Sequence, residues 1–265
     1  MDASFCELSL GDGPLVATAI HDGHDLRPEV AQHVALGEAE RLREEDPFTG
    51  TWTALAPTRL VARRSRFEVD LNRPRERCVY RCPEDAWGLE VWCKDPPEGL
   101  IERSLAAYDD FYATLERIEA ERAERHGRFV VFDLHAYNHR RDGPQGVPAA
   151  VSKNPEVNVG TGTLADRARW APLIERFVAD LASADVLGRR LDVRENVRFR
   201  GGNLGRWTHE RFADSGCVLS VEFKKFFMDE WTGVLDTAQH AAIGRALAAT
   251  VPGVLEELAR LGARL

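Results

Sequence analysis

Three short, predominantly apolar runs constrain the fold of this chain more than any other feature of the sequence. They span residues 15–20, 129–134 and 217–223, and each has the length of a buried strand. Long segments with helical patterning separate them. Strands that alternate with helices indicate βα units and a mixed, mostly parallel twisted sheet with helices on both faces. Because 265 residues can share one core, we predict a single α/β domain over residues 1–265.

The segments between the apolar runs supply the predicted helices. Apolar residues recur every three or four positions over residues 97–126 and 170–181, which indicates amphipathic helices. Residues 28–45 and 234–261 are also predicted to be helical, the second with an interruption at Pro252-Gly253. Residues 66–72 alternate strictly between polar and apolar side chains, so we predict a further strand there.

Composition narrows the class of function. The net charge is −8, with 44% hydrophobic and 29% charged residues, so the chain lacks the basic excess of broad nucleic-acid binders. No run approaches the roughly 18 apolar residues that span a bilayer, and the N-terminus lacks the pattern of a signal peptide. We expect a cytoplasmic protein that acts on a small anionic molecule. The five cysteines are expected to be reduced and mostly buried, since their spacing matches no familiar metal site.

Histidines stand at the ends of two apolar runs. His21 and His24 follow residues 15–20, and His135 follows residues 129–134. Two imidazoles at this spacing can turn to one point when the backbone curls, and neutral imidazole is the commonest protein ligand for a transition metal. Ligands of open α/β sheets collect beyond the carboxyl ends of the strands. We therefore predict that His21, His24 and His135 hold one Zn²⁺ per chain.

Two carboxylates accompany these histidines. Asp133 points to the same strand face as His135, where it either orients the imidazole or makes a structural hydrogen bond. Glu222 lies inside the third apolar run, where burying an unpaired carboxylate is costly. Its carboxylate either pairs with Lys224, Lys225 or an arginine, or serves as a general base whose pKa is tuned by partial burial. We favour the general base because of the nearby histidines.

Arginines and an asparagine suggest the charge of the substrate. Arg66, Asn72 and Arg73 are concentrated in the predicted strand at 66–72 and its exit. Guanidinium groups bind carboxylates in a two-pronged geometry, so this element suits an anionic ligand. The glycine turn at residues 200–205 could also bring its backbone close to a ligand. It lacks the Lys-Ser/Thr of a phosphate loop.

The segment at residues 138–155 is a long polar loop rich in glycine and proline. Loops of this length inside a compact domain are usually functional or mobile. Because it follows His135 directly, we expect it to lie over the site.

Assembled in this way, the chain resembles the N-formylglutamate amidohydrolase family, which is itself similar in fold to the zinc carboxypeptidases. The resemblance covers about residues 16–230 and rests on five motifs: His21-Asp-Gly-His24, Ser65-Arg-Phe-Glu-Val-Asp-Leu-Asn-Arg73, Asp133-Leu-His135, Arg200-Gly-Gly-Asn and Val221-Glu-Phe-Lys-Lys-Phe-Phe.

The resemblance implies a role for each matched position. His21, His24 and His135 would be the zinc ligands. Many relatives have glutamate where this chain has His24, and Glu29 is a rival ligand for that reason.

The same likeness implies the remaining site residues. Asn72 and Arg73 would hold the substrate carboxylate, Arg66 would contact a carbonyl or carboxylate and stabilise the oxyanion, and Glu222 would be the catalytic glutamate. The expected activity is zinc-dependent hydrolysis of the amide of a small N-acyl amino acid such as N-formylglutamate. The alternatives are a carboxypeptidase acting on short peptides and a metal- or ligand-binding protein without catalysis.

Overall fold

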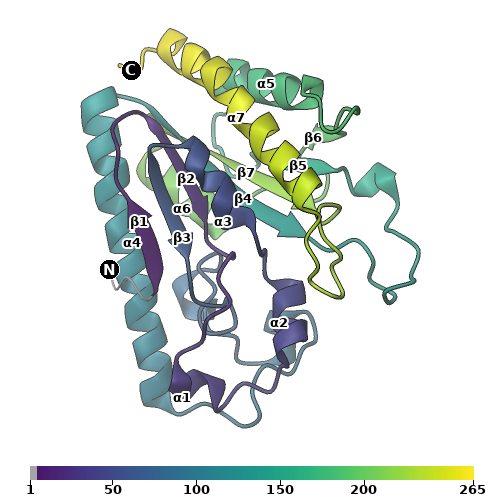
Figure 1. Ribbon diagram of the computed structural model, residues 1–265. Coiled ribbons are helices and arrows are strands. Elements are labelled where there is room, and N and C mark those ends of the chain that lie inside the picture. The colour runs from purple at the N-terminus through teal and green to yellow at the C-terminus, as the bar shows by residue number, and fades with distance from the viewer. Residues whose placement is uncertain (1–4) are drawn as a thin grey trace.

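A computed structural model describes residues 5–265, and its centre is a seven-stranded mixed sheet (Figure 1). The strand order is β1-β3-β2-β4-β7-β5-β6. The two halves of the chain contribute to the one sheet, which confirms the predicted α/β class. The strands are β1 (Cys6–Ser9), β2 (Leu15–Ala19), β3 (Thr58–Ala62), β4 (Phe129–Tyr137), β5 (Val157–Gly160), β6 (Val193–Glu195) and β7 (Gly216–Lys224).

Strand direction decides which side chains can meet. β2 is parallel to β3 and β4, and β4 is parallel to β7, whereas β1 and β5 pair antiparallel with β3 and β7. The carboxyl ends of β2, β3, β4 and β7 therefore share one edge. In the β4–β7 ladder His135 is the register partner of Glu222. Paired residues on neighbouring strands project to the same face, so the ladder places the imidazole beside the carboxylate.

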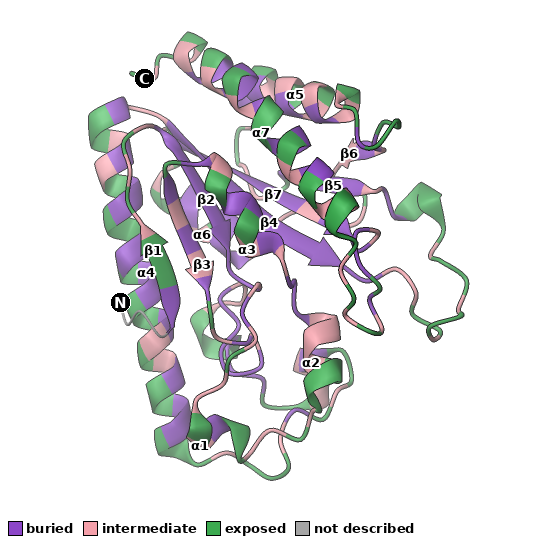
Figure 2. Cartoon of the chain, viewed as in Figure 1, coloured by how far each residue is buried: buried purple, intermediate pink, exposed green. Residues whose placement is uncertain are grey.

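Helices cover both faces of the sheet, and the period of two along each strand explains how. Val130, Phe132 and Leu134 pack with α3, α5 and α7, whereas Phe129 and Val131 pack with α4 and α6. Figure 2 shows the central strands β2, β4 and β7 almost entirely buried between these layers. The helices are α1 (Pro28–Ala31), α2 (Glu38–Glu44), α3 (Thr49–Trp52), α4 (Glu98–His126), α5 (Arg167–Ser183), α6 (Asn203–Arg211) and α7 (Thr237–Arg260), with short 3-10 turns at Thr53–Leu55, Arg75–Arg77, Pro83–Ala86 and Val151–Lys153.

The predicted elements with long periodic patterns are present. The three apolar runs correspond to β2, β4 and β7, and the two amphipathic segments correspond to α4 and α5. The predicted interruption at Pro252 is wrong, because α7 continues through that residue to Arg260. The single helix predicted over residues 28–45 is also wrong, since the chain there forms α1 and α2 with irregular backbone between them.

The predicted strand at residues 66–72 is absent. The amides of Glu68 and Val69 donate to the carbonyl of Ser65, at 3.0 and 3.4 Å, and those of Asn72 and Arg73 donate to Asp70. These local hydrogen bonds make turns rather than a ladder. Apolar and polar side chains of the segment are both buried, so the alternation does not mark one solvated face.

Among residues 5–265, none of the helices is both long and apolar enough to cross a bilayer.

A buried acid between α4 and α6 links stability to pH. Glu119 is fully buried, and its Oε1 accepts a hydrogen bond of 2.9 Å from Thr208 of α6, while Oε2 has no partner within residues 5–265. Burial raises the pKa of Glu119 to about 8 from 4.5. The folded chain then binds one more proton than the unfolded chain between these values. The free energy of unfolding is therefore not reduced by this acid below pH 4.5, and it falls as the pH rises from 4.5 to about 8.

We predict that Glu119→Gln raises the melting temperature at pH 9 relative to the native chain and changes it far less at pH 5. Glutamine keeps the hydrogen bonds of the protonated acid and cannot ionise, so it avoids a cost of about 1.4 kcal/mol per pH unit. Thermal melts at both pH values provide the measurement, with Glu102→Gln on the exposed side of α4 as the control. Equal shifts at the two pH values would contradict the assignment.

Candidate functional site

A cleft opens at the edge of the sheet where β2, β4 and β7 end. It encloses about 410 Å³. This is the edge at which open α/β sheets bind their ligands. Most of the predicted site residues line it, together with others that the sequence analysis did not select. The lining includes His21, Arg43, Glu44, Asp46, Arg66, Asn72, Arg73, Trp87, Leu89, His135, Tyr137, Asn138, Arg141, Phe199, Gly201, Gly202, Glu222 and Lys225.

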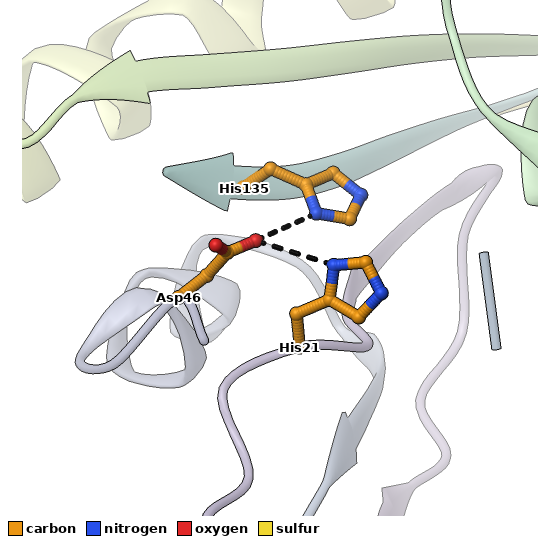
Figure 3. A group of neighbouring side chains, drawn as sticks. All are labelled: His21, Asp46 and His135. Atoms are coloured by element: carbon orange, nitrogen blue, oxygen red, sulfur yellow. Dashed lines mark hydrogen bonds and ion pairs between the residues drawn. The ribbon is translucent and has the colours of Figure 1, made fainter. Parts of the chain in front are cut away.

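Three buried side chains converge on one point of this cleft, as Figure 3 shows. They are His21, Asp46 and His135, and their potential ligand atoms all lie within 4.8 Å of one another. Asp46 Oδ2 lies 2.9 Å from His135 Nδ1 and 3.4 Å from His21 Nδ1. Two imidazole nitrogens and one carboxylate oxygen form a donor set that suits a divalent transition metal such as zinc.

In both imidazoles, the Nε2 nitrogen contacts a carboxylate. His21 Nε2 lies 2.7 Å from Asp70 Oδ1, and His135 Nε2 lies 3.0 Å from Asp133 Oδ2. Each Nδ1 therefore faces the convergence point. Asp133 is fixed in turn by the Thr18 hydroxyl, which donates to its Oδ1 at 2.7 Å. Metal-binding histidines characteristically show this pairing of the second nitrogen with a carboxylate, which sets the tautomer and the ring orientation.

Acidic side chains surround the two imidazoles in a buried space. Burial alone would lower the pKa of His135, but Asp133, Glu222 and Asp46 outweigh it and raise that pKa well above its usual value. Burial alone would raise the pKa of Asp46, but its contacts with His135 and His21 lower it instead. Buried charges need partners of opposite sign. The carboxylates around His21 and His135 therefore favour a cation, and the residues present fit a divalent metal. These carboxylates are those of Asp46, Asp70, Asp133 and Glu222.

Asp46 reaches the cluster because of the residue that follows it. The segment after α2 ends at Pro47, and the residue before a proline is biased away from helical backbone toward extended backbone. The Asp46 amide donates to the carbonyl of His21 at 2.9 Å, so the two candidate ligands share a backbone hydrogen bond. Asp46 was not among the predicted site residues. An acid before a proline at the end of a predicted helix was the available signal.

His24, which the sequence predicted as a ligand, lies outside this cluster. Its Nδ1 lies 2.5 Å from Glu45 Oε2, and Arg41 donates to its carbonyl at 2.9 Å. The backbone does not curl into a helical turn between His21 and His24. A side chain on Gly23 would lie 2.3 Å from the carbonyl carbon of Arg63, so this residue packs directly on the neighbouring backbone. His21 and His24 consequently point apart.

Glu29 also lies outside the cluster. It is exposed on the short helix α1, where its carboxylate lies 3.5 Å from Arg27 and 3.4 Å from Arg103. Asp46 is the donor that stands beside His21 and His135, where His24, or its rival Glu29, was predicted.

Glu222 faces the cleft from β7. Within residues 5–265 no ion pair joins its carboxylate to Lys224, Lys225 or an arginine, although these were the alternatives to a catalytic role. Burial raises the pKa of Glu222 to about 7, with His135 acting in the opposite direction. A carboxylate with such a pKa can accept a proton near neutral pH and return it.

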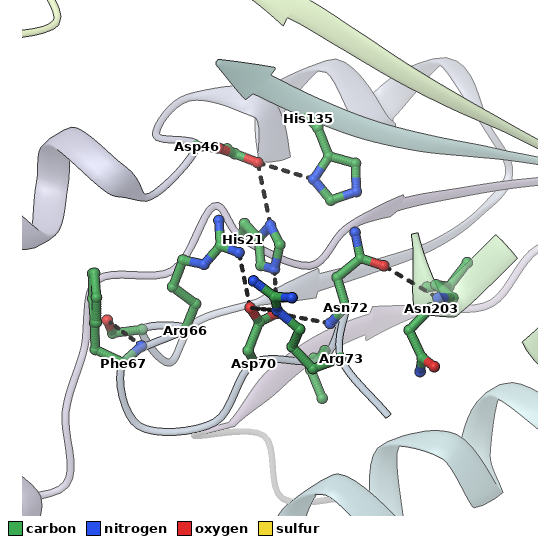
Figure 4. Close-up of polar contacts among 12 residues, drawn as sticks. His21, Asp46, Arg66, Phe67, Asp70, Asn72, Arg73, His135 and Asn203 are labelled. Atoms are coloured by element: carbon green, nitrogen blue, oxygen red, sulfur yellow. Dashed lines mark hydrogen bonds and ion pairs between the residues drawn. The ribbon is translucent and has the colours of Figure 1, made fainter. Parts of the chain in front are cut away.

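Asn72 is oriented by the amino end of α6. Its Oδ1 accepts a hydrogen bond of 3.2 Å from the Leu204 amide, which leaves the side-chain nitrogen facing the cleft (Figure 4). The glycine turn makes this possible, because a side chain on Gly202 would lie 2.1 Å from Asn72 Oδ1. The turn was predicted to bring its backbone to a ligand. Its Gly201 and Gly202 do line the cleft, and Gly202 also makes room for Asn72.

The two arginines differ in how far their donors are already used. Arg66 donates to Asp70 at 2.8 Å, to the Tyr80 hydroxyl at 3.2 Å and to the carbonyl of Glu44 at 3.2 Å. Arg73 lies 3.7 Å from Asp70, and 31% of its side chain is exposed. Arg73 is therefore the better placed of the two for binding an anion.

Trp87 stands over both guanidinium groups and was not selected from the sequence. Its ring centre lies 4.7 Å from the Arg66 guanidinium carbon and 5.9 Å from that of Arg73. Asp70, which accepts hydrogen bonds from several of these groups, was placed on the polar face of the predicted strand without a role, so it was missed as well. Neither residue carries a local sequence signal for its role.

The predicted cover over the site is only partly present. From the loop at residues 138–155, Asn138 and Arg141 line the cleft. Val147 and Val151 are exposed, at 83% and 62%, and the loop extends away from the sheet in Figure 1. That the loop closes over a substrate stays a prediction.

The fold and the cleft define an α/β protein with a polar, partly cationic binding site at the carboxyl edge of its parallel strands. A family model described as N-formylglutamate amidohydrolase matches residues 13–227. The chain therefore belongs to the N-formylglutamate amidohydrolase family, as its motifs predicted, and this family hydrolyses carbon–nitrogen bonds. No curated protein matches the chain.

Solved structures share the fold. An N-formylglutamate amidohydrolase from Ralstonia eutropha JMP134 has a TM-score of 0.75 at 18% identity, over 97% of this chain and 99% of that chain. A gene product of Agrobacterium tumefaciens has a TM-score of 0.66 at 18% identity, over 96% of each chain. A more distant likeness, with a TM-score of 0.41 at 13% identity, is to a putative carboxypeptidase A from Shewanella denitrificans, over 95% of this chain and 61% of that chain.

We predict that Asp46→Ala abolishes tight zinc binding, whereas His24→Ala leaves it near the native level. The first change removes a converging donor, and the second removes a side chain that is engaged with Glu45. Zinc content after dialysis, measured by elemental analysis, distinguishes the two variants. Full loading of Asp46→Ala together with metal loss in His24→Ala would restore the three-histidine site.

Proposed function

We propose that this protein is a zinc-dependent amidohydrolase that cleaves the amide of a small N-acyl amino acid such as N-formylglutamate. Family membership supports the reaction class. The observation that carries the proposal is the convergence of His21, Asp46 and His135 next to Glu222, which is the register partner of His135. These groups bring to one point a set of possible metal ligands and a carboxylate that forms no ion pair within residues 5–265.

The residues that would hold the metal are His21, Asp46 and His135. When bound, zinc supplies Lewis acidity, which polarises the scissile carbonyl and lowers the pKa of an attacking water. Glu222 accepts the proton of that water and returns it to the nitrogen of the leaving amine. Its pKa of about 7 suits both transfers, because neither the acid nor the base form is strongly disfavoured near neutral pH.

The cationic wall of the cleft positions the substrate. Arg73 and the side-chain nitrogen of Asn72 hold the carboxylate next to the scissile amide. Arg66, fixed by Asp70 and Tyr80, contributes positive charge where the carbonyl oxygen becomes negative. Arg141 also lines the cleft and forms no ion pair within residues 5–265. A cation in addition to Arg73 fits a substrate with two carboxylates.

Short peptides are the second candidate substrates. The loop at residues 138–155 contributes only its first part to the lining, so the cleft is not closed on that side. A panel that contains N-formylglutamate, other N-acyl amino acids and dipeptides, assayed with zinc-loaded protein, separates the candidates. Hydrolysis of dipeptides alone would establish the carboxypeptidase alternative, and zinc binding without any turnover would establish the non-catalytic one.

Glu222→Gln is predicted to lower kcat by about 10²–10⁴, the range for a lost acid–base group, while KM changes little. Glutamine keeps the shape of the side chain but cannot accept the water proton, and Glu222 is not among the proposed zinc ligands. Zinc content and melting temperature should stay near their native values. Turnover close to native in this variant would rule out the general-base role.

Arg73→Ala is predicted to raise KM at least tenfold for carboxylate-bearing substrates, because a hydrogen bond to a charged group contributes about 1.5–3 kcal/mol. Zinc content should not change. The matched control is Arg75→Ala, which removes a guanidinium paired with Asp109 at 2.6 Å outside the cleft. If both variants keep the native KM, Arg73 does not bind the substrate.

A further inference from the structure

Lys225 is a buried cation whose side chain has no carboxylate partner. Only 1% of the residue is exposed, and within residues 5–265 no acid forms an ion pair with its ammonium group. The ammonium donates instead to two backbone carbonyls, those of Arg43 and Glu45, at 2.6 Å each. Burying a charge is costly unless its hydrogen bonds compensate, so these two contacts account for its position.

Both carbonyls belong to the end of α2, directly before Asp46. The last carbonyls of a helix have no partner within the helix. The carbonyl of Arg43 would normally meet the amide four residues later, but that residue is Pro47, which has no N–H. The proline that ends the helix and turns Asp46 toward the site therefore leaves an unsatisfied acceptor. A cation near a helix C-terminus is favourable because it compensates these carbonyls.

The donors that satisfy these carbonyls come from the two strands that carry other site residues. Asn138, which follows β4, donates its side-chain amide to the carbonyl of Arg43 at 2.8 Å. Lys225 follows β7, and its own amide donates to the carbonyl of Tyr137 at 3.0 Å, which continues the β4–β7 pairing. The ladder that aligns His135 with Glu222 is thus tied to the segment that carries Asp46.

We propose that Lys225 is the positioning residue for Asp46, holding the end of α2 at the distance from β4 and β7 at which its carboxylate meets His21 and His135. This inference rests on the metal-binding role proposed for Asp46. Lys225 does not itself touch the proposed metal. Its effect is transmitted through the carbonyls on either side of Glu44 and through the backbone to Asp46.

The test compares Lys225→Met with Lys224→Met in the full-length protein. Both substitutions remove an ammonium group at the end of β7, but no hydrogen bond joins the Lys224 side chain to the Asp46 segment. Zinc chloride is titrated against a chromophoric chelator. Lys225→Met should weaken zinc binding by about 10–100-fold, the range for lost partners of metal ligands, and Lys224→Met should leave it unchanged. Lys225→Arg, which keeps a buried cationic donor, should recover part of the affinity.

A second readout needs no metal and separates this inference from the proposed function. The amide of Asp46 donates to the carbonyl of His21, so its hydrogen exchange reports on the position of the segment. In metal-free Lys225→Met this amide should exchange at least about tenfold faster, while the amide of Phe132 in the sheet serves as the reference for global destabilisation. If the native protein binds no zinc, the proposed metal site fails, and this measurement still decides the role of Lys225.

Unchanged exchange at Asp46, or equal acceleration at Asp46 and Phe132, would overturn the proposal. If Lys225→Met does not fold, Lys225→Gln provides the same test, because it removes the ammonium group that donates to the carbonyls of Arg43 and Glu45 and keeps a polar side chain at the buried position. The expected result is a smaller acceleration confined to the Asp46 segment. No change there would contradict the inference equally.

Discussion

The carboxylate of Asp70 is the interaction on which the arrangement of the site depends. It is fully buried and accepts from the Tyr80 hydroxyl, from Arg66 at 2.8 Å and from the Asn72 amide at 2.8 Å, and it holds His21 Nε2 at 2.7 Å. Burial would raise its pKa, but Arg66 and His21 lower it well below the usual value. One ionised group thus fixes both a candidate metal ligand and the arginine side of the cleft, so the distance between them is set by a single residue.

Much of the fold and half of the site follow from local rules. A buried strand is recognisable from a short apolar run, and parallel strands align their carboxyl ends, so His21, His135 and Glu222 were expected to approach one another. The period of two along β4 also placed Asp133 behind His135, where the structure finds it. These inferences needed only strand direction and side-chain alternation.

The remaining part of the site depends on contacts that the sequence does not display. The spacing of His21 and His24 suggested a shared ligand point only for a curled backbone, whereas Gly23 packs against the Arg63 backbone and keeps the two side chains apart. Residues 66–72 alternate like a strand, but they form turns that bury both sides of the segment. The alternation therefore gave no sign that Asp70 is a buried acceptor in the site. Asp46 is brought in by the docking of α2 on distant strands. Such positions are decided by tertiary packing rather than by local pattern.

The pairing of β2 with β4 has a consequence for how the chain acquires its site. These adjacent strands are separated by the whole of α2, α3, β3 and α4, and the Thr18–Asp133 hydrogen bond joins residues 115 positions apart. Closing so long a loop costs entropy before any contact repays it. β4 and β7 are also far apart in the chain, because β5, α5, β6 and α6 lie between them. The long helix α4 can gain structure from its own local contacts, but the convergence of His21 with His135 and Glu222 must await the assembled centre of the sheet. Binding competence is therefore among the last properties that the folding chain acquires.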